Sequence, residues 1–170
     1  MAEGYLRYGV VAGPHGLQGS VYLIPYSGDS SALAGIGQIW LGGDDPLEAI
    51  RYPCTSYRTF KKGALLRLAG VSDRTAADPL KGRVVWVARA DLPPLAPGEW
   101  YLDDLRGAVV RDALGIRIGT VEDFNYGAGG IMFVIHRGNR AILIPWVAAF
   151  VSGISPSGEV MLTERAPLDL

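Results

Sequence analysis

A proline-rich segment constrains this chain more than any other feature, because it interrupts an otherwise regular succession of short apolar runs. The segment is Asp91-Leu92-Pro93-Pro94-Leu95-Ala96-Pro97-Gly98. Its three prolines lack backbone donors and hold the chain extended, as in a linker. A length of 170 residues accommodates two small domains. We therefore predict one domain over residues 1–90, a linker over residues 91–98 and a second domain over residues 99–170.

The first part of the sequence consists of short β-rich runs separated by glycine and proline turns, a pattern typical of sheets. Ser72 or Asp73 can cap one short helix, which we expect to close a barrel mouth with Ala76, Ala77 and Leu80. Six strands are predicted, enough for a small barrel: residues 5–12, 21–26, 38–41, 49–59, 64–68 and 84–88.

The second part also alternates apolar runs with turns, and it predicts a second small β-barrel, so the fold class is all-β. Residues 127–130, Gly-Ala-Gly-Gly, are expected to form a hairpin loop, since no Gly-Lys-Ser/Thr follows them. The apolar residues 141–154 are fewer than the roughly 20 of a membrane-spanning helix, and we expect them to form buried core. The predicted strands are residues 105–110, 116–123, 131–136, 141–144 and 160–163.

Composition and charge narrow the class of protein. The single cysteine, Cys54, cannot form an internal disulfide, and no signal peptide is visible, so we expect a cytoplasmic protein. The net charge of −1 argues against a protein that coats nucleic acid by positive charge alone. Residues 1–90 hold 10 Lys/Arg and 7 Asp/Glu (+3), whereas residues 91–170 hold 6 and 10 (−4). An acidic second part suits a basic partner.

Side chains suited to catalysis or metal binding are few and scattered. Cys54, His15 and His136 match no zinc-site spacing, although a Cys–His pair brought together by folding stays open. Adjacent residues on a strand face opposite sides, so without a turn neither Asp103-Asp104 nor Glu122-Asp123 converges on a metal ion. A solvated surface or a hydrogen-bonded turn is expected for each pair. We predict no catalytic residue, no metal ligand and no cofactor.

Two segments remain that core packing explains poorly. In Gly13-Pro14-His15-Gly16-Leu17-Gln18-Gly19, the glycines permit unusual backbone angles and leave His15 and Gln18 available to a partner, unless the loop is only a tight connection. Directly after the linker, Trp100 and Tyr101 stand beside Asp103 and Asp104, a combination typical of aromatic anchors with an acidic rim. The alternative is that one ring fills the second barrel and the other covers the domain junction.

Four stretches carry a family resemblance through their order and spacing: residues 9–19, residues 68–77 with 80–82, residues 92–95 followed by 99–107, and residues 143–146. Together they resemble the RimM family of bacterial ribosome maturation factors. In the third stretch, which includes Glu99-Trp100-Tyr101-Leu102-Asp103-Asp104-Leu105-Arg106-Gly107, the family usually has two tyrosines in place of Trp100 and Tyr101.

The resemblance implies a six-stranded N-terminal barrel like those of translation factors and a C-terminal barrel of the photosynthetic-reaction-centre (PRC) type. It also implies binding to the immature 30S subunit with its 16S rRNA, and to a ribosomal protein of the S19 class in the subunit head. The position of Trp100 and Tyr101 is where the family's association with the subunit is most sensitive. We expect a monomer that assists 30S assembly and 16S rRNA processing by binding, without enzymatic activity or a membrane partner.

Two other classes of function stay open at this stage. An enzyme acting on ribosomal RNA would need a nucleophile, a metal site or a cofactor pocket, and the sequence offers none that is convincing. An adaptor for membranes or electron transfer is suggested by the relatives of the PRC-type barrel, on fold analogy alone.

Overall fold

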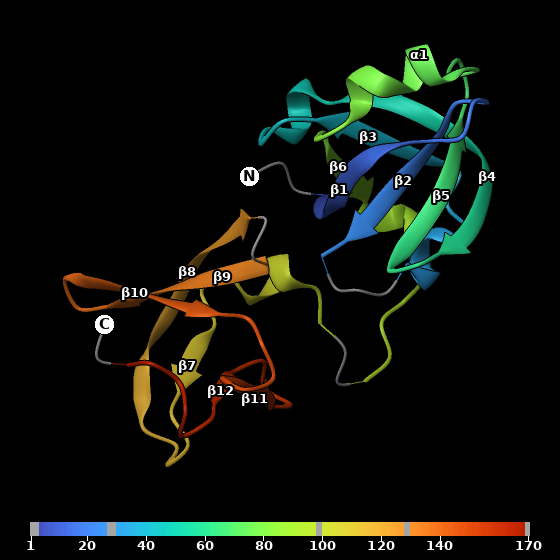
Figure 1. Ribbon diagram of the computed structural model, residues 1–170. Coiled ribbons are helices and arrows are strands. Elements are labelled where there is room, and N and C mark those ends of the chain that lie inside the picture. Colours follow the sequence, from blue (N-terminus) through green and yellow to red (C-terminus); the bar gives the residue numbers. More distant parts are fainter. Residues whose placement is uncertain (1–3, 27–29, 98–99, 128–129, 169–170) are drawn as a thin grey trace. The chain divides into compact units, whose positions relative to one another are not determined.

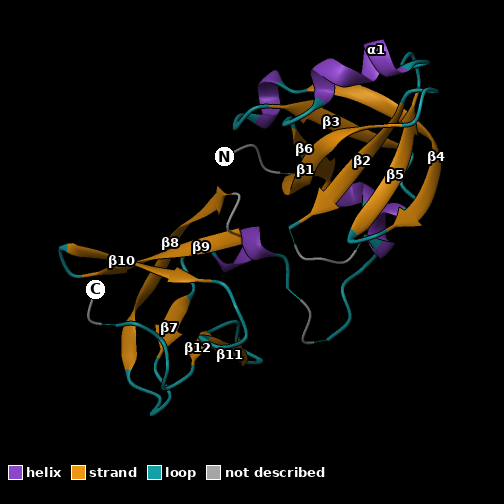
Figure 2. Cartoon of the chain, viewed as in Figure 1, coloured by secondary structure: helices purple, strands orange, loops and turns teal. Residues whose placement is uncertain are grey.

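The computed structural model describes residues 4–26, 30–97, 100–127 and 130–168, and it divides into two units, Met1–Pro94 and Leu95–Leu170. Both units are built mainly of β-strands (Figures 1 and 2). The division falls within the predicted linker, residues 91–98, of which Gly98 lies outside the described residues. The start of that segment still packs on the first unit, since Leu92 is buried and Gln38 Nε2 donates to Asp91 Oδ2 at 3.0 Å.

The first unit is a closed barrel of six strands, as the sequence predicts. Its strands pair in the order β1-β2-β5-β4-β3-β6, with every neighbouring pair antiparallel. Their bounds are β1 Tyr5–His15, β2 Ser20–Pro25, β3 Gln38–Gly42, β4 Ile50–Phe60, β5 Gly63–Leu68 and β6 Val84–Ala88.

Alternation of side chains gives the strands of this barrel a buried inner face and an outer face. In β2, Val21 and Leu23 are fully buried, whereas Tyr22 between them is half-buried on the outer face. The pairing of β1 with β2 shifts register between Val11 and Gly13. Such a bulge bends a strand, which helps a long strand to follow the wall of a small barrel.

The predicted helix lies between β5 and β6. Asp73 Oδ1 accepts the Ala76 N–H at 2.7 Å and thereby caps the helix. Ala77 and Leu80 are buried, as expected for a helix that covers the barrel, but the expectation for Ala76 is wrong, because its side chain lies on the solvent face of the turn. The helical segments of this unit are η1 Ser31–Leu33, η2 Pro46–Glu48, α1 Arg74–Ala77, η3 Asp78–Leu80 and η4 Arg89–Asp91.

The second unit is a six-stranded sheet preceded by a 3₁₀ turn. Its order is β10-β9-β8-β7-β12-β11, and the β7–β12 pair is parallel. Gly127 and Gly130 pair at the end of the β8–β9 hairpin, and residues 128–129 between them lie outside the described residues. The bounds are η5 Leu102–Leu105, β7 Val109–Arg111, β8 Arg117–Gly127, β9 Gly130–Arg137, β10 Arg140–Pro145, β11 Val151–Ile154 and β12 Val160–Leu162.

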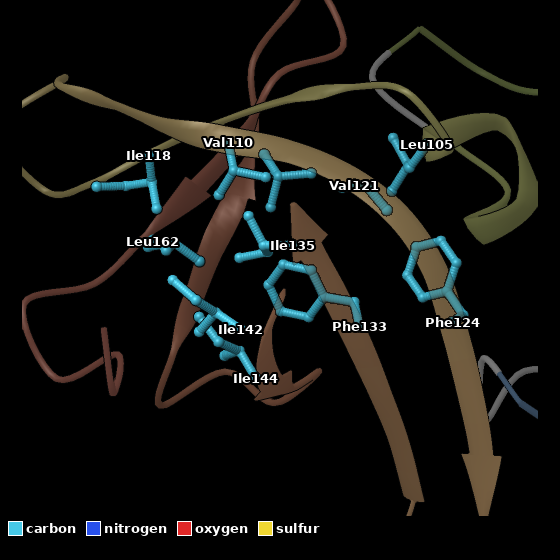
Figure 3. Close-up of a cluster of buried hydrophobic side chains, with 11 residues drawn as sticks. Leu105, Val110, Ile118, Val121, Phe124, Phe133, Ile135, Ile142, Ile144 and Leu162 are labelled. Carbon is cyan, nitrogen blue, oxygen red and sulfur yellow. The ribbon is translucent and has the colours of Figure 1, made fainter. Parts of the chain in front are cut away.

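One hydrophobic cluster fills the second unit (Figure 3). Its largest fully buried side chain is Phe133, whose ring lies 6.5 Å from that of Phe124. Strands from both halves of the sheet order contribute to this one cluster, so the sheet curls around a single core. The members are Leu105, Val110, Ile118, Val121, Phe124, Phe133, Ile135, Ile142, Ile144, Val160 and Leu162.

The structure corrects three expectations for the second unit. Residues 105–110 are not one strand, because Leu105 ends the η5 turn in the core and β7 begins only at Val109. Residues 141–154 are not uniformly buried, because β10 alternates between two faces and leaves Leu143 42% exposed, and Val147 beyond it is 46% exposed. The end of the same stretch forms β11, a strand that the sequence did not predict.

Candidate partner-binding site

The predicted aromatic and acidic side chains lie together on one short segment of the second unit. We call residues 100–104 the aromatic–acidic segment; it contains Trp100, Tyr101, Asp103 and Asp104 and runs into the η5 turn. Tyr101 precedes the turn, and its carbonyl accepts the Asp104 N–H at 3.0 Å. Leu105, at 1% exposed, fixes the end of the turn in the core. The segment is therefore held in one conformation by its own unit.

Trp100 lies on the surface of this unit and is 38% exposed. A Cβ atom added to Gly158 would lie 3.3 Å from Trp100 Cη2, so the indole rests directly on that glycine. Gly158 has a φ of +84° and closes the turn before β12, where its N–H donates to Ser155 O at 2.9 Å. A residue other than glycine would be strained there and would press on the ring. Part of the indole is seated while the rest faces solvent.

Asp103 and Asp104 lie in the η5 turn, one of the two settings expected for them, and there Asp103 is buried and Asp104 is exposed. The Asp103 side chain is 5% exposed, and its Oδ1 lies 3.4 Å from Arg106 Nη2. Arg106 Nη1 also pairs with Asp123 Oδ1 on β8. One guanidinium thus ties the turn to the sheet through two carboxylates.

The same guanidinium is partly shielded from water. Its central carbon lies 5.9 Å from the centre of the Phe124 ring. Partial burial alone lowers the pKa of Arg106, but the hydrogen bond to Asp123 and the charges of Asp123 and Asp103 outweigh burial, so the pKa is raised. Arg106 is therefore charged near neutral pH.

His15 and Gln18 belong to the first unit. The predicted loop of residues 13–19 is shorter than expected, because β1 continues to His15, which pairs with Ser20 of β2. The imidazole is half-buried, with its centre 4.7 Å from that of the Phe60 ring. Gln18 is exposed at the hairpin tip, and its Oε1 accepts a hydrogen bond from Arg67 Nη2 at 2.5 Å.

The remaining candidates for chemistry have ordinary surroundings. Cys54 is half-buried in β4, and burial raises the pKa of its thiol to about 11, so the thiol stays protonated near neutral pH. Within the described ranges, no three His, Cys, Asp or Glu side chains come together as metal ligands. No helix in the described part of the chain is long and apolar enough to cross a membrane.

Comparison with known sequences identifies both units. Residues 6–92 match the sequence profile of the RimM N-terminal domain, and residues 97–166 match that of the PRC-barrel domain. The ribosome maturation factor RimM of Deinococcus radiodurans is 33% identical over 168 residues, which cover 96% of this chain and 86% of that protein. The chain belongs to the RimM family. The RimM factor of Thiobacillus denitrificans is 32% identical over 157 residues, covering 92% of this chain and 82% of that protein.

The family match confirms the predicted all-β fold, with a RimM N-terminal barrel followed by a PRC-type barrel. Two solved structures of the RimM family are also similar. A crystal structure of RimM from Pseudomonas aeruginosa has a TM-score of 0.45 at 20% identity and covers 94% of this chain and 96% of that chain. The solution structure of the N-terminal domain of Thermus thermophilus RimM has a TM-score of 0.45 at 23% identity, over 54% of this chain and 98% of that one.

The RimM-like motif at residues 143–146 has a structural role in this chain. The indole of Trp146 packs edge-on against Phe124 at 5.8 Å and Phe133 at 5.2 Å. Its backbone N–H donates to Ile131 O at 2.7 Å. These contacts hold the end of β10 against the core of the PRC barrel.

Three residues that organise the RimM-like segments were missed in the sequence. Arg106 had a local signal, because it stands three residues after Asp103, a spacing that brings side chains together on a helical turn. Gly158 and Phe60 had none. Their contacts with Trp100 and His15 join segments that are distant in the sequence and meet only through the fold.

Proposed function

We propose that this chain is a cytoplasmic ribosome maturation factor that assists late assembly of the 30S head and 16S rRNA processing. Its curated relatives are named ribosome maturation factors, and the similarity extends over more than nine-tenths of the chain. The observation that carries the proposal is the aromatic–acidic segment, which presents a seated but exposed indole on a turn fixed to the core. The factor acts as a monomer, by binding.

The segment suits a basic protein surface. Trp100 and Tyr101 supply large rigid rings, the side chains that most often dominate the binding energy of protein interfaces. The exposed Asp104 adds negative charge beside them, whereas the buried Asp103 pairs with Arg106 and fixes the turn. Because the turn is ordered before binding, less conformational entropy is lost on association. The proposed occupant is a head protein of the S19 class on the immature 30S subunit.

A binding role is also favoured over an enzymatic one. The thiol of Cys54 is protonated at neutral pH and half-buried in a strand, which disfavours a nucleophile. His15 packs against Phe60, so its ring already serves the structure of the barrel. We assign the chain no catalytic residue and no cofactor; its contribution to assembly is the free energy of binding.

Cosedimentation of the full chain with small subunits tests the proposal. Extracts of a growing strain that expresses the tagged chain are separated on a sucrose gradient, and the protein is located by immunoblot. We expect it to travel with subunits that contain precursor 16S rRNA and to be absent from translating ribosomes. Direct binding to a purified S19-class protein should follow. A chain that stays at the top of the gradient, or that travels with membranes, contradicts the proposal.

A further inference from the structure

None of the six strands of the first barrel carries an acidic residue, and in two long stretches the turns and loops lack one as well. Residues 4–28 and 49–72, which include β1, β2, β4 and β5, contain no aspartate or glutamate, although the whole chain has 17 of them. These four strands adjoin one another in the order β1-β2-β5-β4 (Figure 1). The same two stretches hold six of the chain's cationic side chains: Arg7, Arg51, Arg58, Lys61, Lys62 and Arg67.

The strand register places several of these cations around aromatic rings on the outside of the barrel. In β5, Leu66 points into the core and Arg67 points outward. Leu65, on the same face as Arg67, pairs with Tyr22 on one side and with Arg58 on the other. Phe60 follows Arg58 by two residues and shares its face. We call this surface the basic face, formed by His15, Tyr22, Arg58, Phe60, Lys61, Lys62 and Arg67.

Two rings of the basic face, those of His15 and Tyr22, contact the ring of Phe60. The Phe60 ring lies 4.7 Å from that of His15 and 5.4 Å from that of Tyr22, both edge-on. Lys61 Nζ lies 5.3 Å from the centre of the Phe60 ring. The Tyr22 hydroxyl accepts the Lys62 N–H at 3.3 Å, which fixes the hairpin against the rings. All three rings are half-buried, so each keeps part of its surface toward solvent.

No carboxylate among the described residues neutralises the positive charges of the basic face. Arg58, Lys61 and Lys62 are exposed, and none of the four cations forms an ion pair with a described carboxylate. Arg67 instead donates to the neutral Gln18, at 2.5 Å to the side-chain oxygen and 3.4 Å to the carbonyl oxygen. Four cations are therefore available to an anionic partner.

We propose that the basic face binds a single-stranded or looped RNA segment. Barrel proteins that bind single strands combine cations along the phosphate backbone with aromatic rings on which bases stack. Here the four cations of the basic face would contact phosphates. A base would stack on Phe60 and the rings that neighbour it. An acidic protein segment would use the same charges, and the binding of polyglutamate tests for it. The inference rests on the proposed function and names the part of the chain that contacts RNA.

Fluorescence anisotropy of the full chain with a labelled oligouridine of about ten nucleotides, a length within the usual site size, tests this inference. We compare the wild type with the double variant Lys61→Asn plus Lys62→Gln; asparagine suits the φ of +48° at Lys61. Each lost phosphate contact reduces the slope of log affinity against log salt by about 0.7, so the double variant should reduce it by about 1.4. The control is Arg137→Gln plus Arg140→Gln, an equal charge loss at the β9–β10 hairpin, which should leave the slope unchanged.

Stacking is tested separately from charge. Phe60→Leu should weaken oligouridine binding by about tenfold without changing the salt slope, whereas Phe60→Tyr, which keeps a ring, should bind as the wild type. Thermal unfolding of each variant is recorded alongside. Absence of oligouridine binding by the wild type, or equal binding by Phe60→Leu, overturns the inference. Tighter binding of polyglutamate than of oligouridine also overturns it and assigns the basic face to an acidic protein.

The two proposals can fail independently. If the chain cosediments with precursor subunits but binds no oligouridine, the basic face is not an RNA site and the proposed function stands. If the chain binds oligouridine through the basic face but does not cosediment with precursor subunits, the RNA site stands and the proposed function is wrong.

Discussion

The two units both contain six strands around one core, but they differ in how those strands meet. In the first barrel, every neighbouring pair is antiparallel and all six strands have five or more residues. In the second unit, β7, β11 and β12 have three or four residues. The strand β7 pairs in parallel with β12, which lies about fifty residues later in the sequence. The first unit is therefore closed by antiparallel pairs alone, whereas the second includes a parallel pair between two short strands that are distant in the sequence.

This difference in strand architecture determines where each unit can present a binding surface. In the first barrel, the strand register fixes which side chains point outward, and the basic face consists of such side chains and the adjoining turn. The second unit instead presents the aromatic–acidic segment on a turn, held by Leu105, Arg106 and Gly158. Changes to the second unit should therefore act through the anchors of one turn, and changes to the first should act through side chains on its surface.

The largest expected effect tests whether the two cores are independent. Phe133→Ala removes a fully buried ring from the second core and should cost about 3–5 kcal/mol, enough to unfold a small domain. Leu66→Ala in the first barrel should cost about 2–5 kcal/mol. In differential scanning calorimetry, each variant should lower one transition and leave the other in place. A single transition that moves as a whole in both variants would mean that the units fold as one.

A smaller effect is expected at the ion pair that anchors the turn. Arg106→Gln leaves the Asp103 carboxylate buried without its guanidinium and should cost about 2 kcal/mol in urea unfolding. Asp103→Asn should cost less, because an amide needs no counter-charge. In the double variant, the two losses should not add, with a coupling energy of about 1 kcal/mol. Strict additivity would show that Asp103 and Arg106 do not stabilise the turn together.

The smallest effect concerns an exposed pair in the second unit. The hydrogen bond from Arg111, at 2.8 Å, lowers the pKa of Glu159 below its ordinary value. A folded pKa below the unfolded value, about 4.3, means that the pair stabilises the fold above that pH and that the contribution is lost as pH falls through the folded pKa. Thermal midpoints of Glu159→Gln and the wild type should therefore differ slightly at neutral pH and converge in acid. A constant difference at every pH would contradict this assignment.

The fold of the first barrel could be predicted nearly strand by strand, because alternation and turn residues are local signals. The principal difference is β1, which continues to His15 across a bulge that no local pattern reveals. In the second unit, β11 was missed because its residues show no alternation of burial and its pairing with β12 depends on the fold. Leu105 was predicted as the start of a strand because it is apolar, but it ends the η5 turn, and its side chain packs in the core.

The candidate site was only partly visible in the sequence. The adjacent rings of Trp100 and Tyr101 after the prolines marked the aromatic–acidic segment, because two large aromatics beside acids are uncommon on a surface. The sequence did not show that Asp103 is buried and Asp104 exposed, since that depends on the turn. It also did not show the basic face, whose rings come from three strands and meet through pairing.

We propose that Trp100 and Tyr101 form a docking surface and do not fill the core of the second unit. The most direct test measures thermal unfolding and cosedimentation with precursor small subunits on the same preparation of Trp100→Ala plus Tyr101→Ala. Aromatic anchors commonly contribute about 2 kcal/mol or more each, so we expect binding to weaken by roughly a thousandfold, less if the two effects overlap, in a protein that stays folded. Trp100→Tyr, which supplies a second tyrosine, should bind as the wild type. A folded double variant that cosediments normally would show that Trp100 and Tyr101 are not a docking surface.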